Sequence, residues 1–261
     1  MDYNRLLEGK HAFITSGQRG IGREIALLFA RQGATVAVGG PREEAVRAAQ
    51  AELMSIQPAS RGYVCNLGKR EETENTCATV LKDFGKVDIL VNTVGVNRQK
   101  PAHEITDQDM EELLEINYKS GLRCARKMLP GMMERKAGAI LNISSIHGVV
   151  TMPKFALYAG TKGAVNASAR AMALDYAPYG IRVNTICPGL IMSDNMVDEL
   201  NGYPEGEKRE AFEAMLRNMQ PLPPGTMADV ANAALFLASG MAAYITGQVI
   251  MVDGGASAKA H

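Results

Sequence analysis

The sequence predicts an α/β fold in which about seven parallel strands form one doubly wound sheet with helices on both faces. Two observations support this prediction. Short apolar runs rich in Val, Ile and Ala alternate along the chain with stretches of helical periodicity. A glycine-rich turn follows the first apolar run directly and opens the first helical stretch. Because strand–helix–strand connections are right-handed, such an alternation gives a parallel sheet that is covered on both faces.

The first half of the chain supplies four of the expected strands. The first helical stretch carries Ile21, Ile25, Leu28 and Phe29 on one face, which is typical of a helix packed on a sheet. We expect strands at 11–15, 35–38, 62–65 and 87–91, and helices at 20–31, 42–54 and 71–84.

The second half continues the alternation. A long helical stretch begins at the cap-like pair Thr106 and Asp107. No repeat or interdomain linker is visible, so residues 1–261 are expected to form a single domain. We expect helices at 107–135, 156–177, 197–219 (interrupted at 201–204) and 227–238, and strands at 139–143, 181–186 and 249–252.

Composition argues against several classes of partner. Lys plus Arg and Asp plus Glu each number 28, so no basic excess indicates a nucleic-acid or anionic membrane partner. No apolar run approaches the ~20 residues that span a bilayer, and residues 1–10 lack the apolar core of a signal peptide. The four cysteines and four histidines show no metal-ligand spacing. We therefore expect no metal site and a cytoplasmic protein with free thiols.

The glycine-rich turn predicts a dinucleotide-binding site of the Rossmann type. Glycines let the chain turn tightly there, and the following helix presents free N–H groups to a pyrophosphate. A lone glycine motif also fits an ordinary turn, but its position between a strand and a helix favours the binding function. The residues expected to contact the cofactor here are Ser16, Gly17, Arg19, Gly20, Ile21 and Gly22.

Tyr158 and Lys162 predict the chemistry. They are four residues apart in a helical stretch and so share one face. An ammonium beside a phenol favours the phenolate, so we expect Lys162 to lower the pKa of Tyr158 from its usual value of about 10. Tyr158 would then serve as a general acid or base. The pair alone also fits a solvated helix face, so further residues are needed.

Two polar residues lie where a site of this kind needs them. Ser145 ends the fifth expected strand, and ligands of doubly wound sheets bind outside the carboxyl ends of the strands. Asn117 falls in the middle of the long helix, where asparagine is a poor helix former. A polar residue placed against helix propensity indicates a functional or network role.

With Asn117, Ser145, Tyr158 and Lys162 in these places, nearly the whole chain resembles a short-chain dehydrogenase/reductase. The resemblance implies hydride transfer between a nicotinamide cofactor and a secondary alcohol or ketone. In it Tyr158 exchanges the proton, Ser145 binds the substrate oxygen, Lys162 tunes Tyr158 and binds the nicotinamide ribose, and Asn117 holds a water. The further cofactor contacts that it implies are Asn66, Leu67, Asn92, Gly95, Pro188, Gly189, Ile191 and Ser193.

The chain departs from the family's pattern in its cofactor contacts. Ser16 stands where the family has a glycine, Thr93 and Val94 follow Asn92, Ser193 replaces the usual threonine, and Asn66 replaces an acidic residue near the adenine. These changes conserve size or polarity and leave the four catalytic positions whole.

The cofactor choice depends on the end of the second strand. NAD enzymes usually have a carboxylate there for the ribose 2′-hydroxyl, and alignment with the family gives Gly40 at this position. Arg19 and Arg42 could bind a 2′-phosphate, although related NADP enzymes usually have the arginine at the position of Pro41. We therefore favour NADP(H), with NAD(H) as the alternative.

The substrate is left open between two classes. Residues 194–220 lie where relatives have a substrate lid, and their methionines and leucines suit a steroid-like or acyl substrate, although such spacing is also typical of packing. Arg98 and Lys100, after the fourth strand, instead suit the carboxylate of a sugar acid, or are ordinary solvated charges. His147 is a further candidate for lining the substrate pocket.

Two other functions stay open. A 3-oxoacyl-carrier-protein reductase would need a basic patch near the site, to which Arg126, Lys127, Arg135 and Lys136 could contribute. A non-catalytic nucleotide-sensing protein is the alternative of another class, because fold alone does not give function. The family resemblance also implies a homotetramer paired through helices 107–135 and 156–177 and strand 249–252, with Ala164, Val165, Ala169 and Met172 suited to a helix–helix contact.

Overall fold

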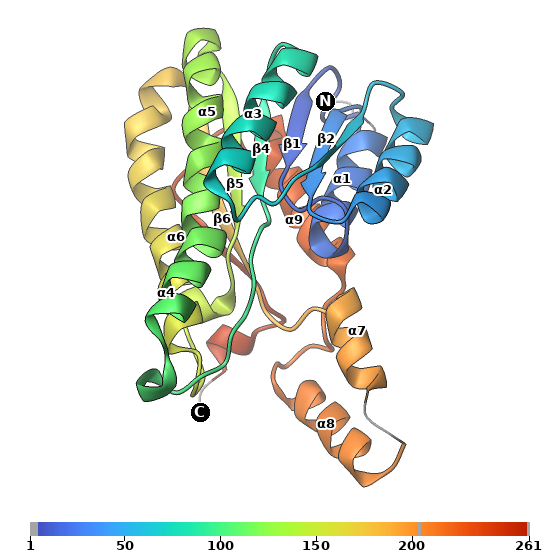
Figure 1. Ribbon diagram of the computed structural model, residues 1–261, viewed down its shortest axis with the longest axis vertical. Helices are drawn as coiled ribbons and strands as arrows, with labels where there is room; N and C mark the ends of the chain where they lie inside the picture. Colours follow the sequence, from blue (N-terminus) through green and yellow to red (C-terminus); the bar gives the residue numbers. More distant parts are fainter. Residues whose placement is uncertain (1–4, 203–204, 260–261) are drawn as a thin grey trace.

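A single sheet of seven parallel strands organises the molecule, as expected from the sequence (Figure 1). The computed structural model describes residues 5–202 and 205–259. The strand order β3-β2-β1-β4-β5-β6-β7 reverses between β1 and β4, which is the topological switch point where such sheets bind ligands. The strands are β1 (His11–Ile14), β2 (Thr35–Gly40), β3 (Arg61–Val64), β4 (Ile89–Asn92), β5 (Gly138–Ile143), β6 (Ile181–Pro188) and β7 (Val249–Val252).

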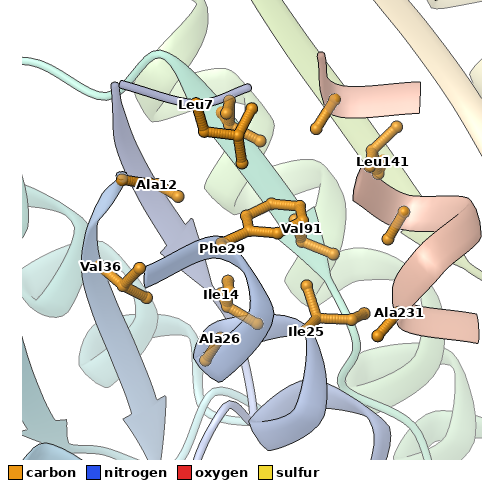
Figure 2. Packing of buried hydrophobic residues seen from close by; sticks show 14 of the residues in the cluster. Leu7, Ala12, Ile14, Ile25, Ala26, Phe29, Val36, Val91, Leu141 and Ala231 are labelled. Atoms are coloured by element: carbon orange, nitrogen blue, oxygen red, sulfur yellow. The ribbon is translucent and has the colours of Figure 1, made fainter. Parts of the chain in front are cut away.

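Helices cover both faces of the sheet with separate apolar cores. On one face Ile25 and Phe29 pack among Ile14 and Val91 of the strands and near Ala231 (Figure 2). This layer consists of α1 (Gly20–Arg31), α2 (Glu43–Ile56) and α9 (Met227–Ala238). The opposite layer consists of α3 (Arg70–Phe84), α4 (Asp107–Leu114), α5 (Ser120–Arg135) and α6 (Ala156–Tyr176).

The long helix predicted over 107–135 is not a uniform α-helix. It begins as expected, with Thr106 and Asp109 forming a capping box at the start of α4. Between α4 and α5, however, Glu115–Lys119 form a π-helical turn that contains Asn117. Single π-helical turns inside α-helices frequently occur at functional sites. Asn117, which is a poor helix former, therefore lies where the helix changes locally from α to π.

Two further helices stand beyond the end of the sheet. They are α7 (Asp194–Asn201) and α8 (Glu207–Asn218), which Figure 1 shows at the lower end of the molecule. We expected one helical stretch at 197–219 with an interruption at 201–204, of which Tyr203 and Pro204 lie outside the described residues. The helix before that interruption begins earlier than expected, at Asp194. In the part of the chain that the structure describes, no helix has the length and apolar character to span a membrane.

Candidate active site

The glycine-rich turn places the end of β1 close to the first turn of α1. A Cβ atom on Gly22 would lie 2.5 Å from the carbonyl oxygen of Ser16, so a side chain there would separate the turn from the helix. Ser16 itself has a φ of 53°, in the left-handed region that favours glycine. A glycine, which the family's pattern has at this position, would adopt the same φ without that strain. The turn thus has the tight geometry that was predicted for a dinucleotide-binding loop.

A pocket of about 400 Å³ opens beside this turn, at the switch point of the sheet. Its size and place fit the adenosine end of a dinucleotide cofactor. Six of the predicted cofactor contacts line it: Ser16, Arg19, Arg42, Asn66, Leu67 and Gly95. The pocket therefore collects residues from four separate segments that the sequence assigned to one ligand.

Gln18 occupies the place where an NAD enzyme would have its ribose-binding carboxylate. Its side chain is buried, and a Cβ atom on Gly40 would lie 2.2 Å from its amide carbon. With its amide nitrogen directed at the backbone, Gln18 donates to Gly39 O at 2.9 Å and to Ser16 O at 3.2 Å. An acidic side chain at position 40 would have to displace this buried amide. Arg42 lies two residues after Gly40, exposed directly before α2.

The wall of this pocket after β3 is held by local hydrogen bonds. The backbone N–H of Asn66 donates to Glu72 Oε2 at 2.7 Å, and the side-chain oxygen of Asn66 accepts from Gly68 N at 3.0 Å. The N–H of Asn66 in turn keeps the pKa of the Glu72 carboxyl below its usual range. Leu67, which is buried, supplies an apolar surface of the kind that an adenine ring would contact.

Tyr158 and Ser145 lie together at the carboxyl end of β5. Burial raises the pKa of Tyr158, while a hydrogen bond with the Ser145 hydroxyl acts in the opposite direction. We expected the pKa of Tyr158 to lie below its usual value because of Lys162, whereas the pKa lies above it. The physical reason is that the phenol is desolvated, which disfavours its charged form. Tyr158 therefore holds its proton at neutral pH.

Lys162 is buried beneath the tyrosine ring. Its ammonium lies 5.7 Å from the centroid of the Tyr158 ring and donates to Ile143 O at 3.1 Å. Burial lowers the pKa of Lys162 to about 8. A Cβ atom on Gly95 would lie 3.0 Å from the Lys162 Nζ, so the absence of a side chain at position 95 leaves room for the ammonium.

Asn117 joins the π-helical turn to the loop that follows β4. Its side-chain oxygen accepts from Val96 N at 2.8 Å, and its amide nitrogen donates to Val96 O at 2.9 Å and to Thr161 Oγ1 at 3.1 Å. Thr161 in turn donates to Tyr158 O at 2.8 Å. The side chain of Asn117 thus fixes the loop between the cofactor pocket and the helix that carries Tyr158 and Lys162. The predicted role of Asn117 in holding a water stays a prediction.

His147 lies against the tyrosine, as expected of a residue near the substrate. Its ring stacks on Phe155 with centroids 4.1 Å apart and meets the Tyr158 ring edge-on at 5.8 Å. Nδ1 of His147 lies 3.1 Å from Thr151 Oγ1, and burial lowers the pKa of the imidazole, so the ring is neutral at pH 7. His147 also lines a second pocket, of about 260 Å³, which extends toward α8.

Several predicted contacts lie outside these two pockets. Arg98 pairs with Asp109 and, at 2.8 Å, with Glu112, and Lys100 bonds Asp109 at 2.6 Å, so both cations of this loop are engaged by carboxylates. The amide of Asn92 bonds Asn142 Oδ1 at 2.9 Å within the sheet instead of lining the cofactor pocket. Gly17, Gly20, Ile21 and Gly22 belong to the glycine-rich turn and the start of α1, and four further predicted contacts follow or end β6: Pro188, Gly189, Ile191 and Ser193.

The sequence reasoning missed three polar residues, two at these pockets and one at the start of α1. Gln18 lies below Gly40, Asp194 contacts the first turn of α1, and Gln220 lies at the second pocket. The signal for Gln220 was a polar residue directly before the apolar, proline-rich segment 221–225. No group of His, Cys, Asp and Glu suited to a metal ion was found among residues 5–202 and 205–259.

Comparisons with known proteins agree with this geometry. The model of a family described as Enoyl-(Acyl carrier protein) reductase matches residues 16–257. The 3-oxoacyl-(acyl-carrier-protein) reductase FabG of Staphylococcus aureus is 36% identical over 248 residues, which cover 94% of this chain and 97% of that protein. The protein of the same name from Rickettsia felis is 36% identical over 252 residues, covering 95% and 97%.

Solved structures show the same architecture along the whole chain. A putative short-chain alcohol dehydrogenase from Sinorhizobium meliloti superposes with a TM-score of 0.87 at 28% identity, covering 98% of this chain and 100% of that one. ElxO with NADP bound gives a TM-score of 0.88 at 28% identity, covering 96% and 99%. Sequence, site and fold therefore agree: the chain belongs to the short-chain dehydrogenase/reductase family and is an NAD(P)-dependent oxidoreductase.

Proposed function

We propose that the protein uses NADPH to reduce the 3-oxo group of an acyl thioester to a 3-hydroxyl group, with the acyl chain carried on an acyl carrier protein. The observation that carries this proposal is the pairing of Tyr158 and Ser145, two hydroxyl groups in contact at the end of β5. Two hydroxyl donors at one point suit a single carbonyl oxygen that gains negative charge during reduction. The FabG relatives, at 36% identity, support the choice of substrate.

The state of the tyrosine favours the reductive direction. Because burial raises its pKa, Tyr158 carries a proton at neutral pH that it can give to the substrate oxygen. When bound, NADPH supplies the hydride to the carbonyl carbon. Ser145 donates a hydrogen bond to the same oxygen, and the nearby Lys162 ammonium stabilises the phenolate that Tyr158 becomes.

The pocket around Gly40 supports NADPH over NADH. The pocket contains no carboxylate from β2 that would repel a 2′-phosphate, and the exposed Arg42 lies at its rim with Arg19. ElxO, whose structure holds NADP, is similar along nearly its whole length. An arginine offers a 2′-phosphate two parallel N–H donors, which gives both charge and geometry.

The second pocket supports an acyl substrate more than a sugar acid. Most of its lining is apolar, from Ile146, Val150, Met152, Leu190 and Met219. The cations that would have bound a sugar-acid carboxylate, Arg98 and Lys100, are engaged by carboxylates of α4. A steroid-like substrate would also suit the apolar lining and is the alternative that the assay below includes.

Some of the basic residues that we expected to bind a carrier protein lie away from the active site. Arg135 donates to Val87 O at 2.8 Å, next to the start of β4, so it lies at the amino end of the strands, opposite the site. Lys136 follows it directly. Arg126, in the middle of α5, pairs with Glu74 at 2.7 Å but stays largely exposed. Of the predicted basic residues, Arg126 and its neighbour Lys127 are the ones left for an acidic carrier.

We also propose that the protein forms a homotetramer through the α5–α6 face and the edge at β7, and that α7 and α8 form a lid of the single domain. Leu174 on α6 is 79% exposed, and the Tyr244 side chain before β7 is fully exposed. Ala169, which was expected in the helix contact, instead packs in the core of its own chain. Light scattering on the purified protein measures the assembly, and a monomer would contradict it. A cytoplasmic location stays a prediction.

The decisive test is a reduction assay that follows NADPH absorbance. We expect turnover of the N-acetylcysteamine thioester of 3-oxobutanoate, with lower kcat/KM for ketosteroids and for oxo forms of sugar acids. Tyr158→Phe should abolish turnover and leave NADPH binding unchanged, because the phenyl ring keeps the shape but lacks the proton. Tight NADPH binding with no turnover of any substrate would instead support the nucleotide-sensing alternative.

A further inference from the structure

An amide oxygen without a hydrogen-bond donor lies at the pocket beyond the catalytic tyrosine. Gln220 follows α8, lines the 260 Å³ pocket with His147, and is 4% exposed. Its Nε2 donates to Leu216 O at 3.1 Å, whereas its Oε1 is buried and has no partner among the described residues. A buried acceptor without a donor is costly, and in native structures it frequently marks a functional site.

The orientation of this amide is fixed by its partner. The carbonyl oxygen of Leu216 can only accept a hydrogen bond, so the nitrogen of the amide must face it and the oxygen must face away. The stem of Gln220 is also confined. A Cβ atom on Gly254 would lie 3.1 Å from the Gln220 Cγ and 3.3 Å from the Leu222 Cβ, so the side chain packs against the bare backbone of Gly254.

Three other polar residues at this pocket, His147, Thr151 and Lys259, have hydrogen-bond partners. His147 and Thr151 lie 3.1 Å apart through Nδ1 and Oγ1, and Lys259 donates to Asn218 O at 2.8 Å. The rest of the pocket wall is mainly apolar. Gln220 therefore places in the wall of this pocket a buried acceptor that no described donor satisfies. Met219, the preceding residue in the same wall, has a flexible side chain that can move to admit a substrate atom.

We infer that Gln220 is a specificity-determining residue whose Oε1 accepts a hydrogen bond from an O–H or N–H group of the substrate. The inference rests on the proposed function, and it deepens that function by naming a second chemical feature of the substrate besides the oxo group. Two parts of an acyl thioester could provide the donor: a hydroxyl on the acyl chain, or the amide N–H of the pantetheine-like arm that carries it. A substrate with neither would leave the amide oxygen unpaired.

Three thioesters of the same acyl length separate these sources. S-ethyl 3-oxobutanethioate has no donor, its 4-hydroxy derivative has a hydroxyl on the acyl chain, and the N-acetylcysteamine thioester of 3-oxobutanoate has an amide N–H on the arm. We expect the wild-type protein to prefer one donor-bearing thioester over the donor-free one by roughly 3- to 10-fold in kcat/KM, the value of one hydrogen bond. The preferred thioester identifies the part of the substrate that faces Gln220.

Two glutamine variants make the test specific. Gln220→Met keeps the length of the side chain but removes the acceptor, so it should abolish the preference while retaining turnover of the donor-free thioester. Gln248→Met makes the same change at an exposed glutamine that bonds Thr246 O, and it should keep the wild-type preference. Thermal unfolding of both variants checks that the fold is intact. A loss of rate that is equal for all three thioesters would indicate a structural role and would overturn the inference, as would a wild-type protein without any preference.

Failure of the proposed function is distinguishable from failure of this inference. If no oxo thioester is reduced, the function is wrong, and Gln220 is tested instead with a ketone that is turned over and its hydroxyketone analogue. A hydroxyketone preference that disappears in Gln220→Met would support the inference on a different substrate class. Equal kcat/KM for the two ketones in the wild type would overturn it.

Discussion

The carboxylate of Asp194, at the start of α7, accepts a hydrogen bond of 3.3 Å from the backbone N–H of Gly20, at the start of α1. The first turn of α1 is where a Rossmann-type fold holds the pyrophosphate of its cofactor. A helix N-terminus attracts negative charge, so the carboxylate would compete with a bound pyrophosphate for the same donor. We therefore expect the position of the α7–α8 segment to be coupled to cofactor binding.

Removing this carboxylate should strengthen cofactor binding. Asp194→Ala leaves the N–H of Gly20 to the pyrophosphate and removes a negative charge from its surroundings. We expect the dissociation constant for NADPH, measured by the fluorescence of the cofactor, to fall about 3- to 10-fold, as expected for one competing charged hydrogen bond. Asp198→Ala, an exposed carboxylate in the same helix, should change it little. Weaker binding by the Asp194 variant would contradict the competition and indicate that Asp194 positions the lid for the cofactor.

A substitution of Gly40 should shift the preference from NADPH to NADH only when Gln18 is substituted as well. A Cβ atom at position 40 would lie 2.2 Å from the Gln18 amide carbon, so Gly40→Asp alone should weaken binding of both cofactors. Gly40→Asp combined with Gln18→Ser gives the carboxylate room to bond a ribose 2′-hydroxyl and repels a 2′-phosphate. We expect the ratio of kcat/KM for NADPH to that for NADH to fall at least about 10-fold in the double variant. Arg42→Ala should lower the NADPH value alone, and an equal effect on both cofactors would contradict its proposed role.

The elements that the sequence predicted best are those with strong periodicity. All seven strands and the helices on both faces follow from apolar runs and helical spacing, because burial of those side chains decides the layers. Most element ends moved by a residue or two, as at Arg42, which lies before α2 instead of within it. Boundaries depend on backbone hydrogen bonds that apolar spacing does not encode.

The sequence predicted where the site residues lie but not the pKa values and ion pairs of their side chains. Ser145, Tyr158 and Lys162 were brought together because strand ends and helix faces have fixed geometry. The pKa of Tyr158 depends on how much water its ring loses, which the spacing of residues does not reveal. The ion pairs of Arg98 were missed for a similar reason, since the partners at Asp109 and Glu112 come from the next helix and their approach depends on tertiary packing.

The rates of reduction and of oxidation should change with pH in opposite directions. Because burial raises the pKa of Tyr158, the phenol is protonated at neutral pH and ready for reduction, whereas oxidation needs the phenolate. The kcat for reduction should therefore be constant near neutrality and fall above about pH 8, where Lys162 loses its proton, while kcat for oxidation rises with pH. Ser145→Ala removes a hydrogen bond that lowers the pKa of Tyr158, so the rise in the residual oxidation rate should move to higher pH. A reduction rate that increases with pH would contradict this assignment of the proton donor.

The buried ammonium of Lys162 should lower the stability of the folded protein. Its pKa falls from the usual 10.5 to about 8 in the folded protein, so below pH 8 the folded state bears the full cost of a buried charge, roughly 3 kcal/mol. Between pH 8 and 10.5 the unfolded state binds more protons than the folded state, so this cost declines as the pH rises. Lys162→Met removes the charge but also the bond to Ile143 O, so we expect a net gain of about 1–2 kcal/mol in unfolding free energy at pH 7. Thermal unfolding without cofactor should show a melting temperature that is about 2–6 °C higher at pH 7, with the gain disappearing near pH 10.

A matched control separates this effect from a general loss of lysine charge. Lys82, exposed on α3, carries the same side chain in water, so Lys82→Met should leave the melting temperature nearly unchanged at every pH. Lys162→Met should at the same time lose most of its turnover, because the phenolate of Tyr158 would lack its cation. A variant at position 162 that is less stable than the wild type at pH 7 would show that packing and the Ile143 bond outweigh desolvation. The combination of higher stability and lost activity would show that the protein keeps a destabilising charge because its chemistry needs one.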